Sequence, residues 1–345
     1  MSIVAGLLFA YAMGSWLDWR ALAYLMLASG VAGMCLVAVL PESPVWLMYK
    51  ERDGMARRSL LLLRSQDSVE ACEAVLNDLR QSASDGSHGS TAEGGGIVQL
   101  VCTRGPARTA LLIAIGLMFA QQWSGINAVM FYCGNILETI FPDPHLANSL
   151  AIGVQGMQLV VTIASSLFMD RAGRKPLLIL AALGMAGSGT VLAAYYITQT
   201  CEGGSDGSDL RCVPVLGDMV AVGALYGFVF FYACGMGAIP WFLMGEIFPA
   251  GVKGQATAVC TAVNWLLAFS VTKTVTVLES LFGGAPRGMG WVFVCYSSVS
   301  ALAAVFVWFC VPETKGKSLN DIQRELGRAR ARRLEEEGET ADRDS

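Results

Sequence analysis

Three uncharged amides lie within seven residues of a segment that is otherwise apolar enough to cross a membrane. The segment is LMFAQQWSGINAVMFY, residues 117–132, and the amides are Gln121, Gln122 and Asn127. Polar groups without a partner in hydrocarbon cost several kcal/mol, so intramembrane polar residues tend to be functional. Each amide offers donors and an acceptor together, which suits a neutral, hydroxyl-rich ligand. The segment therefore predicts a polyol site. The alternative is that these amides only join neighbouring helices.

The spacing of these amides also predicts a break in the helix. At 100° per residue, Asn127 points about 120° away from Gln121, so a straight helix cannot aim both at one small ligand. Ser124 and Gly125 lie between them, where a helix can kink. Broken helices in the middle of the membrane form the binding sites of many transporters.

Other apolar segments contribute groups of compatible chemistry. Gln155 and Gln158 are three residues apart, so a helix places them on one face. Trp241 follows a glycine/proline break in GMGAIPWFLMGEIFP, and its flat ring suits the apolar face of a pyranose. Asn264 lies inside a further apolar run. Read alone, Trp241 would be an ordinary core or interface aromatic.

Charged residues gather in three short turns between or after the apolar segments. These turns are DRAGRK (170–175), GEIFPAGVKG (245–254) and VPETKGKS (311–318). Asp170, Glu246 and Glu313 supply the acidic groups, and Arg171, Arg174 and Lys253 supply basic groups that can pair with them. Exposed pairs contribute only about 0–1 kcal/mol each. Placed where helices must separate, the same pairs would instead latch one conformation.

The composition requires that membrane helices position these residues. The chain has 345 residues, is 54% hydrophobic and 15% charged, and has a mean hydropathy of +0.51. Soluble domains carry about 25% charged residues. Eight spans are predicted, near 1–14, 21–40, 108–134, 149–169, 176–198, 217–245, 255–281 and 289–311. The first is short for a crossing, and the alternating pattern of a membrane barrel is not seen. The predicted fold class is an all-α integral membrane protein.

Lysine and arginine divide the loops into two groups. The basic group comprises the loop 41–107, the turns 170–175 and 246–254, and the tail 312–345, while the alternate loops hold only Arg20, Arg211 and Arg287. The positive-inside rule therefore predicts that both termini are cytoplasmic. The loop 41–107 is predicted to contain a polar helix, 51–81, followed by a flexible glycine/serine linker, 82–96. The plasma membrane is favoured over vesicles.

The cysteines, and the residues that enzymes use, exclude other classes of function. The chain has ten cysteines but no CxxC pair and no histidine near a cysteine, so no metal site is predicted. Cys201 and Cys212 bracket a polar loop, where a disulfide can form if that loop faces an oxidising compartment. No span holds a Ser/His/Asp or Cys/His set, so an enzyme is disfavoured. No cofactor and no nucleic-acid partner are predicted.

Taken together, the motifs resemble the sugar porter family of the major facilitator superfamily. The matching motifs are PESPVWL, QQWSGINAVMFY, DRAGRK, IPWFLMGEIFP and VPETKGKS, in that family's order. Within the family, the chain is most similar to arthropod facilitated trehalose and glucose transporters. The resemblance implies two six-helix halves with sugar bound between them by alternating access. It places sugar contacts at Gln121, Gln122, Asn127, Gln158, Trp241 and Asn264. It places a cytoplasmic gate at Asp170, Arg171, Arg174, Glu246 and Glu313.

The chain departs from the family pattern in several ways. Ala238 replaces a proline that is usual there, and Ala233 stands where some members carry a glutamate. Residues 1–40 match the last two helices of the amino-terminal half, and 108–311 match the six helices of the carboxyl-terminal half. We therefore expect sugar transport by facilitated diffusion to need the missing helices, and this chain alone to be inactive. The alternative is a non-transporting sugar sensor, or a regulatory partner of full-length porters. Glucose, fructose and trehalose fit the residues equally well.

Overall fold

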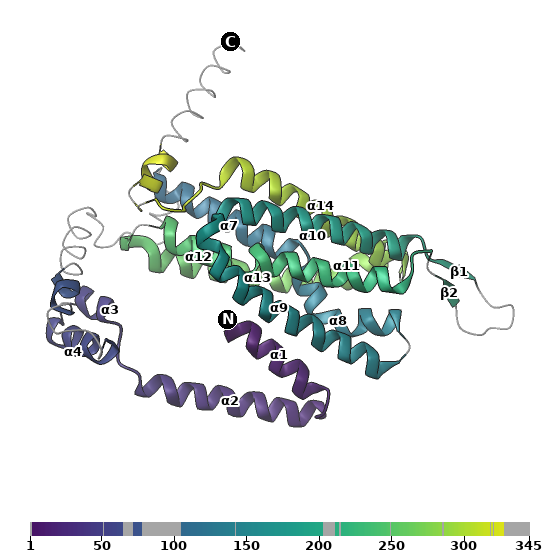
Figure 1. Cartoon of the computed structure of the whole chain (residues 1–345), viewed down its shortest axis with the longest axis horizontal. Helices are drawn as coiled ribbons and strands as arrows, with labels where there is room; N and C mark the ends of the chain where they lie inside the picture. The colour runs from purple at the N-terminus through teal and green to yellow at the C-terminus, as the bar shows by residue number, and fades with distance from the viewer. Residues whose placement is uncertain are drawn as a thin grey trace, which may run out of the picture. The chain divides into compact units, whose positions relative to one another are not determined.

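The computed structural model describes residues 2–50, 52–64, 72–77, 105–141, 143–202, 211–213, 215–248, 250–284, 286–317, 319 and 321–327. The chain divides into two compact units (Figure 1). The larger unit combines Met1–Ser15 with Gln99–Ser345, and the smaller unit is Trp16–Val98. The predicted linker, 82–96, and most of the tail, 328–345, lie outside the described residues.

Membrane-length helices dominate the described residues. Seven are long and apolar enough to cross a bilayer: Trp19–Val39, Pro106–Glu138, Pro144–Ala172, Arg174–Ile197, Asp218–Ile247, Val252–Leu281 and Arg287–Cys310. A shorter apolar helix covers Ile3–Gly14. These elements fall on the eight segments expected from hydropathy. The prediction of an all-helical membrane fold is therefore confirmed.

The larger unit is a helical bundle built from several broken and several continuous helices. In chain order these are α1 (Ser2–Gly14), α7 (Pro106–Trp123), α8 (Ile126–Ile140), α9 (Pro144–Ala172), α10 (Arg174–Ile197), α11 (Asp218–Phe231), the π-helical turn η1 (Tyr232–Met236), α12 (Ile239–Ile247), α13 (Ala250–Leu281) and α14 (Arg287–Cys310). Helix α10 packs against α14 and α11, α7 against α13, and α9 against α8 and α1.

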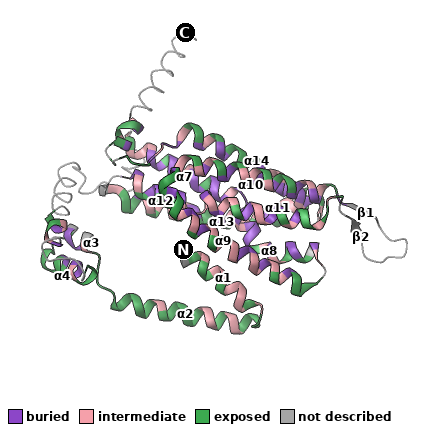
Figure 2. Cartoon of the chain, in the orientation of Figure 1, coloured by how far each residue is buried: buried purple, intermediate pink, exposed green. Residues whose placement is uncertain are grey.

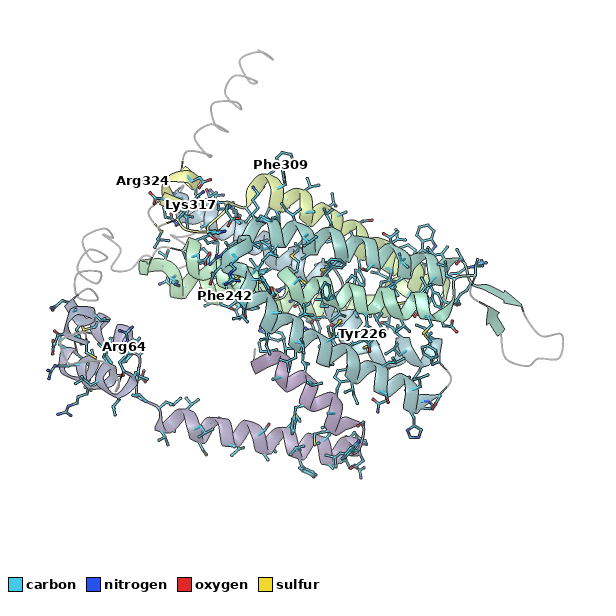
Figure 3. All side chains as sticks on the ribbon, in the orientation of Figure 1. Arg64, Tyr226, Phe242, Phe309, Lys317 and Arg324 are labelled. Carbon is cyan, nitrogen blue, oxygen red and sulfur yellow. The ribbon has the colours of Figure 1, made fainter. Side chains whose placement is uncertain are left out.

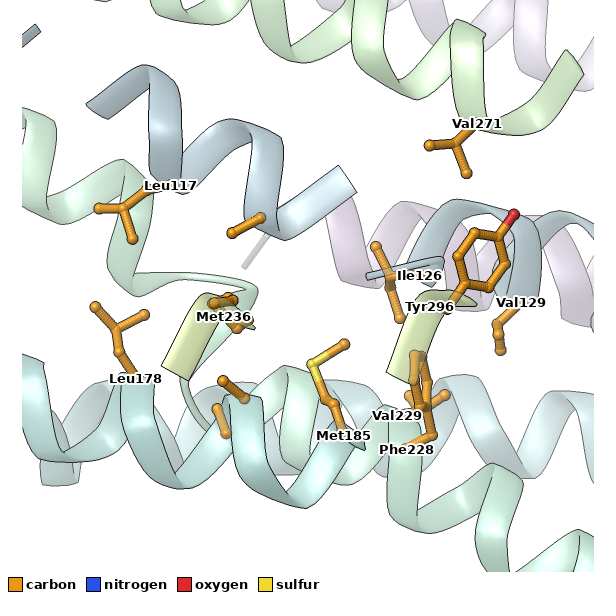
Figure 4. Packing of buried hydrophobic residues seen from close by; sticks show 14 of the residues in the cluster. Leu117, Ile126, Val129, Leu178, Met185, Phe228, Val229, Met236, Val271 and Tyr296 are labelled. Carbon is orange, nitrogen blue, oxygen red and sulfur yellow. The ribbon is translucent and has the colours of Figure 1, made fainter. Parts of the chain in front are cut away.

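Apolar side chains fill the spaces between these helices (Figure 4). Leu117, Met185 and Phe228 are fully buried there, and they come from α7, α10 and α11. Figure 2 shows buried residues where these helices face one another. By contrast, Phe309 on α14 is 71% exposed and points away from the bundle (Figure 3), as expected for a side chain that faces lipid.

The break predicted at Ser124 and Gly125 is present between α7 and α8. Gly125 has φ 89°, a left-handed conformation that suits glycine. A Cβ atom at this position would lie 2.2 Å from the ring of Tyr296. The absence of a side chain therefore lets Tyr296 on α14 pack directly against the break.

A second break lies between α11 and α12, where η1 precedes Pro240. Proline has no backbone N–H, so it cannot donate to the carbonyl four residues earlier, which is that of Met236. The Trp241 N–H bonds the Ala238 carbonyl at 3.2 Å, three residues earlier, instead of the Gly237 carbonyl. The buried carbonyl of Met236 and the partly buried carbonyl of Gly237 therefore need partners from another helix.

The smaller unit contains α2 (Trp19–Val39), α3 (Pro44–Tyr49) and α4 (Asp53–Leu63). Helices α3 and α4 share a small core of Leu47, Met48, Ala56, Leu60, Cys72 and Leu76. Arg57 on α4 forms an ion pair with Glu73. Helix α4 lies within 51–81, where the sequence predicts a polar helix, but it ends at Leu63. Leu47 and Met48 of this core precede that segment.

The loop between α10 and α11 contains a β-hairpin that the sequence analysis does not predict. Strands β1 (Thr200–Glu202) and β2 (Arg211–Val213) pair antiparallel (Figure 1). Strands of three residues are too short to show an alternating pattern. The sequence indicated only that this loop is polar.

Candidate functional site

Three amides form a chain of hydrogen bonds across the break between α7 and α8. The Asn127 amino group donates to Gln122 Oε1, and Gln122 Nε2 donates to Asn264 Oδ1 at 2.6 Å. Gln122 and Asn264 are nearly fully buried. Because Gly125 redirects α8, Asn127 can reach back to Gln122, which a straight helix would not allow. The structure thus brings together groups from α7, α8 and α13.

The bonds in this amide chain all run in one direction. Each link joins an amino group to a carbonyl oxygen, so Oδ1 of Asn127 stands at one end and Nδ2 of Asn264 at the other. A hydroxyl group both donates and accepts. A hydroxyl inserted into a link can therefore accept from the amino group and donate to the carbonyl oxygen, so neither atom is left without a partner.

Gln121 has a different role from its neighbour. Its Nε2 donates to the carbonyls of Met236 and Gly237, at 2.6 and 3.3 Å. These are the two carbonyls that the break before α12 leaves without their helical partners. Gln121 Oε1 is buried and has no hydrogen-bond partner among the described residues. One end of this amide therefore stabilises the fold, and the other end can still accept a hydrogen bond.

Helix α9 presents a stripe of buried polar residues to the bundle. Gln155, Gln158, Thr162 and Ser165 follow one another at helical spacing, and all are buried. Gln158 Oε1 and Gln155 Oε1 have no partner among the described residues, while Gln155 Nε2 lies 3.2 Å from the sulfur of Met130. Gln158 is thus a buried side chain that can still accept a hydrogen bond.

Trp241 and Trp123 have different surroundings in the structure. Trp241 on α12 is 37% exposed and is not part of the buried amide chain. Trp123 directly follows Gln122 and stacks on Phe119, with ring centroids 5.9 Å apart. Its Nε1 is buried and lacks a partner among the described residues. The sequence analysis did not single out Trp123, although its place beside two glutamines was a readable signal.

A small pocket lies between α8, α13 and α14. Its lining is apolar and comprises Ala128, Val129, Tyr132, Ile136, Val275, Met289, Phe293 and Tyr296. None of the predicted sugar contacts lines it. This pocket has no side-chain amide to bind a polyol.

The charged turns meet at the end of the bundle where α9 joins α10. Arg174 forms ion pairs with Asp170 and Glu246, both at 2.9 Å. Thr314 Oγ1 donates to the other oxygen of Glu246 at 2.5 Å. One guanidinium therefore ties α9, α10 and α12 together, and Glu246 links them to the segment after α14.

Glu313 closes the same cluster by capping helix α10. Its carboxylate accepts hydrogen bonds from the backbone N–H groups of Arg174, Lys175 and Lys315, at 3.1, 3.1 and 3.0 Å. A Cβ atom at Gly173, which has φ 91°, would lie 2.9 Å from this carboxylate. Burial alone would raise the pKa of Glu313, but the donated N–H bonds outweigh it and hold the pKa below its ordinary value.

Arg171 differs from the other predicted gate residues. It is exposed and joins the cluster through its carbonyl oxygen, which accepts a bond from Lys315 Nζ at 2.5 Å. Lys253 Nζ bonds the Gly245 carbonyl at 2.8 Å instead of a carboxylate. The structure thus brings the side chains of Asp170, Arg174, Glu246 and Glu313 together and leaves that of Arg171 outside.

The described residues contain no group of three or more His, Cys, Asp or Glu side chains suited to a metal ion. The hairpin register places Cys201 directly opposite Cys212.

Comparisons with known proteins agree on one family. The family model described as Sugar (and other) transporter matches residues 1–326. The chain is 35% identical to the facilitated trehalose transporter Tret1 of Drosophila grimshawi over 327 residues, which is 94% of this chain and 33% of that protein. It is 34% identical to Tret1 of Culex quinquefasciatus, covering 94% of this chain and 59% of that one.

Solved structures give the same result. The proton:xylose symporter XylE of the major facilitator superfamily, bound to 6-bromo-6-deoxy-D-glucose, superposes with a TM-score of 0.72 at 26% identity, covering 94% of this chain and 64% of that one. A partially occluded, inward-open XylE from E. coli gives a TM-score of 0.67 at 25% identity, covering 92% and 63%. The chain spans about a third to three fifths of the length of the two curated relatives described above.

Proposed function

Because this chain belongs to the family of sugar (and other) transporters, within the major facilitator superfamily, we propose that its amide cluster binds a neutral sugar. The observation that carries the proposal is the hydrogen-bonded chain Asn127–Gln122–Asn264 across a helix break. It gathers two buried amides, Gln122 and Asn264, and the half-buried Asn127 from three helices of the bundle. Relatives named as transporters, and not as enzymes, agree with this proposal.

The chemistry of the cluster favours a neutral polyol over an ion. The proposed contacts are Gln121, Gln122, Asn127, Gln158, Trp241 and Asn264, and none carries a formal charge. An anionic substrate would need arginine or lysine for its charge, and a cation would need carboxylates. A hydroxyl matches both ends of an amide, so sugar binding exchanges one set of neutral hydrogen bonds for another.

The substrate class that we propose is a hexose or trehalose, moved by facilitated diffusion. The curated relatives described above are named facilitated trehalose transporters, and the solved relative holds a glucose derivative. The unpaired Oε1 atoms of Gln121 and Gln158 are two further acceptors for sugar hydroxyls. Trp241, partly exposed on α12, is the proposed surface for the apolar face of a sugar ring.

We further propose that the charged cluster around Arg174 is the latch of an alternating-access cycle. Lysine and arginine in the same turns support a cytoplasmic position for this cluster and for both termini. When that side opens, α10 must separate from α12 or from the segment after α14. The ion pairs of Arg174 and the cap by Glu313 then break, which opposes opening.

The whole transport cycle is proposed to need a second helical bundle. The chain spans only part of its relatives, and a site between two halves needs groups from both. We therefore propose that this chain alone does not transport, and that a full-length porter or an amino-terminal half completes it. The plasma membrane is the proposed location. The second candidate function, a sensor or regulatory partner, would bind sugar without moving it.

Uptake of radiolabelled trehalose and glucose in transporter-null cells tests the proposal. The chain is compared alone and joined to the amino-terminal half of a family member. We expect uptake only from the joined protein, and at least tenfold less after Gln122→Ala. Ser166→Ala, a half-buried position on α9 whose hydroxyl bonds the Ile163 carbonyl, is the matched control and should keep uptake unchanged. Normal uptake by the Gln122 variant would contradict the proposed site. Sugar binding without uptake by the joined protein would favour the sensor.

A further inference from the structure

The loop between α10 and α11 folds back on itself in a defined register. In the antiparallel pair, Thr200 lies opposite Val213, Cys201 opposite Cys212, and Glu202 opposite Arg211. The two cysteines are therefore the central pair of the hairpin.

This register puts the two cysteine backbones within disulfide reach. Residues directly opposite in an antiparallel pair have Cα atoms about 4.5–5.5 Å apart. Disulfides join residues whose Cα atoms are usually about 4.4–6.8 Å apart. No backbone movement is therefore needed to bridge Cys201 and Cys212.

The helices at the base of the hairpin are held together independently of the strands. The Tyr195 hydroxyl, near the end of α10, donates to the Asp218 carboxylate in the first turn of α11 at 2.9 Å. Tyr195 and Tyr196 are both buried. The two chain ends that enter the hairpin are therefore fixed close together, which keeps the cysteines near each other.

The remaining described cysteines show no comparable arrangement. The thiols of Cys35, Cys72, Cys133, Cys234, Cys260 and Cys295 are free in the structure. Five of these lie in membrane-length helices, and Cys72 lies in the core of the smaller unit.

We infer that Cys201 and Cys212 form an intramolecular disulfide that closes the hairpin on the non-cytoplasmic side of the membrane. The inference depends on the proposed sidedness, because disulfides persist in oxidising compartments and not in the cytosol. Only Arg211 contributes a positive charge between α10 and α11, in keeping with a loop outside the cytosol.

The bond forms by exchange with a protein disulfide donor, such as the oxidised dithiol of an oxidoreductase in the secretory lumen. One cysteine thiolate attacks the donor and forms a mixed disulfide. The second thiolate then attacks the first cysteine's sulfur, and the donor leaves as a dithiol. The two cysteines lose two protons and two electrons, and the donor is reduced by those two electrons.

Counting reactive thiols in the denatured chain tests this inference. The chain is made in insect cells, dissolved in SDS, and labelled with a polymer-tagged maleimide before or after reduction. Of the ten cysteines, eight should react before reduction and ten after it. Cys201→Ser should give nine in both conditions. The matched control Cys35→Ser should give seven and then nine. Because labelling is done on unfolded chain, burial of a thiol does not affect the count.

Two outcomes would overturn the inference. One is that all ten cysteines react before reduction; the other is that reduction releases a second protein molecule from the chain. Sidedness has its own readout, since a membrane-impermeant maleimide should label the two thiols after mild reduction of intact cells. The count does not depend on sugar. Eight reactive thiols without sugar uptake by the joined protein would contradict the proposed function alone, and ten with uptake by the joined protein would contradict the disulfide alone.

Discussion

Replacing Glu313 with glutamine should weaken the proposed latch by a predictable amount. The carboxylate accepts three backbone N–H bonds, and two of these come from the first residues of α10. Hydrogen bonds to a charged group contribute about 1.5–3 kcal/mol, against about 0.5–1.5 kcal/mol for neutral ones. A negative charge at a helix N-terminus adds about 0.3–1 kcal/mol. Glu313→Gln keeps one acceptor oxygen but loses the charge, so we expect a loss of about 2 kcal/mol.

Thermal unfolding of the purified chain in detergent measures this loss. Each kcal/mol shifts the Tm of a domain of 150–250 residues by about 2–4 °C, so Glu313→Gln should lower the Tm by about 4–8 °C. Glu325→Gln is the control, because its pair with Lys317 is partly exposed and such pairs contribute at most about 1 kcal/mol. The control should shift the Tm by less than half as much.

The pH dependence gives a second, independent check. The pKa of Glu313 is lower in the folded protein than its ordinary value, so its contribution is complete above that ordinary value. As the pH falls through the lowered folded pKa, the contribution is lost. The difference in Tm between the native chain and Glu313→Gln should therefore be full at neutral pH and vanish in strong acid. Equal Tm values at neutral pH, or a difference that persists after acidification, would refute the capping argument.

Three further predictions follow from individual contacts. Gly125→Ala should destabilise the chain by at least about 1 kcal/mol, since alanine disfavours this φ and its Cβ would meet the Tyr296 ring; an unchanged Tm would contradict this. Gln121→Met should lower the free energy of unfolding by about 1–3 kcal/mol, because the carbonyls of Met236 and Gly237 lose their donor. A Tm equal to that of Gln122→Met would show that the two glutamines do not differ in role. Arg174→Met removes both ion pairs of the cluster, so limited proteolysis of the joined protein at the turn 245–254 should become at least severalfold faster; unchanged cleavage would argue against a latch.

Local chemistry made the helix break between α7 and α8 predictable. Gly125 lies between two amides that a straight helix would point apart, and the structure shows glycine in a left-handed conformation there. The partners of the amides were not predictable. Gln121 donates to the Met236 carbonyl, which lies 115 positions away in the sequence. Pro240 leaves this carbonyl without its helical donor, and only the packing of α7 against α12 shows that Gln121 replaces that donor.

For the charged cluster as well, the sequence predicted some contacts and missed others. The signs and positions of Asp170, Arg174 and Glu246 indicated ion pairs, and two such pairs are present. Glu313 was expected to pair with a basic side chain, but it binds backbone N–H groups at the start of α10. Sequence patterns do not show which helix N-terminus lies beside a distant carboxylate. The hairpin at 200–213 was missed for the same reason, because its pairing depends on where α10 and α11 hold its ends.

The most direct test of the central claim is sugar contact with the purified chain, measured by saturation-transfer difference NMR, which detects weak binding. We expect transfer from the protein to trehalose or glucose protons. Gln122→Met and Asn264→Leu should each reduce this transfer at least fivefold. The double variant should reduce it no further, because the two side chains share one hydrogen bond. Ser166→Ala should leave the signal intact. Transfer that stays the same in both amide variants would contradict the claim that this chain of amides binds the sugar.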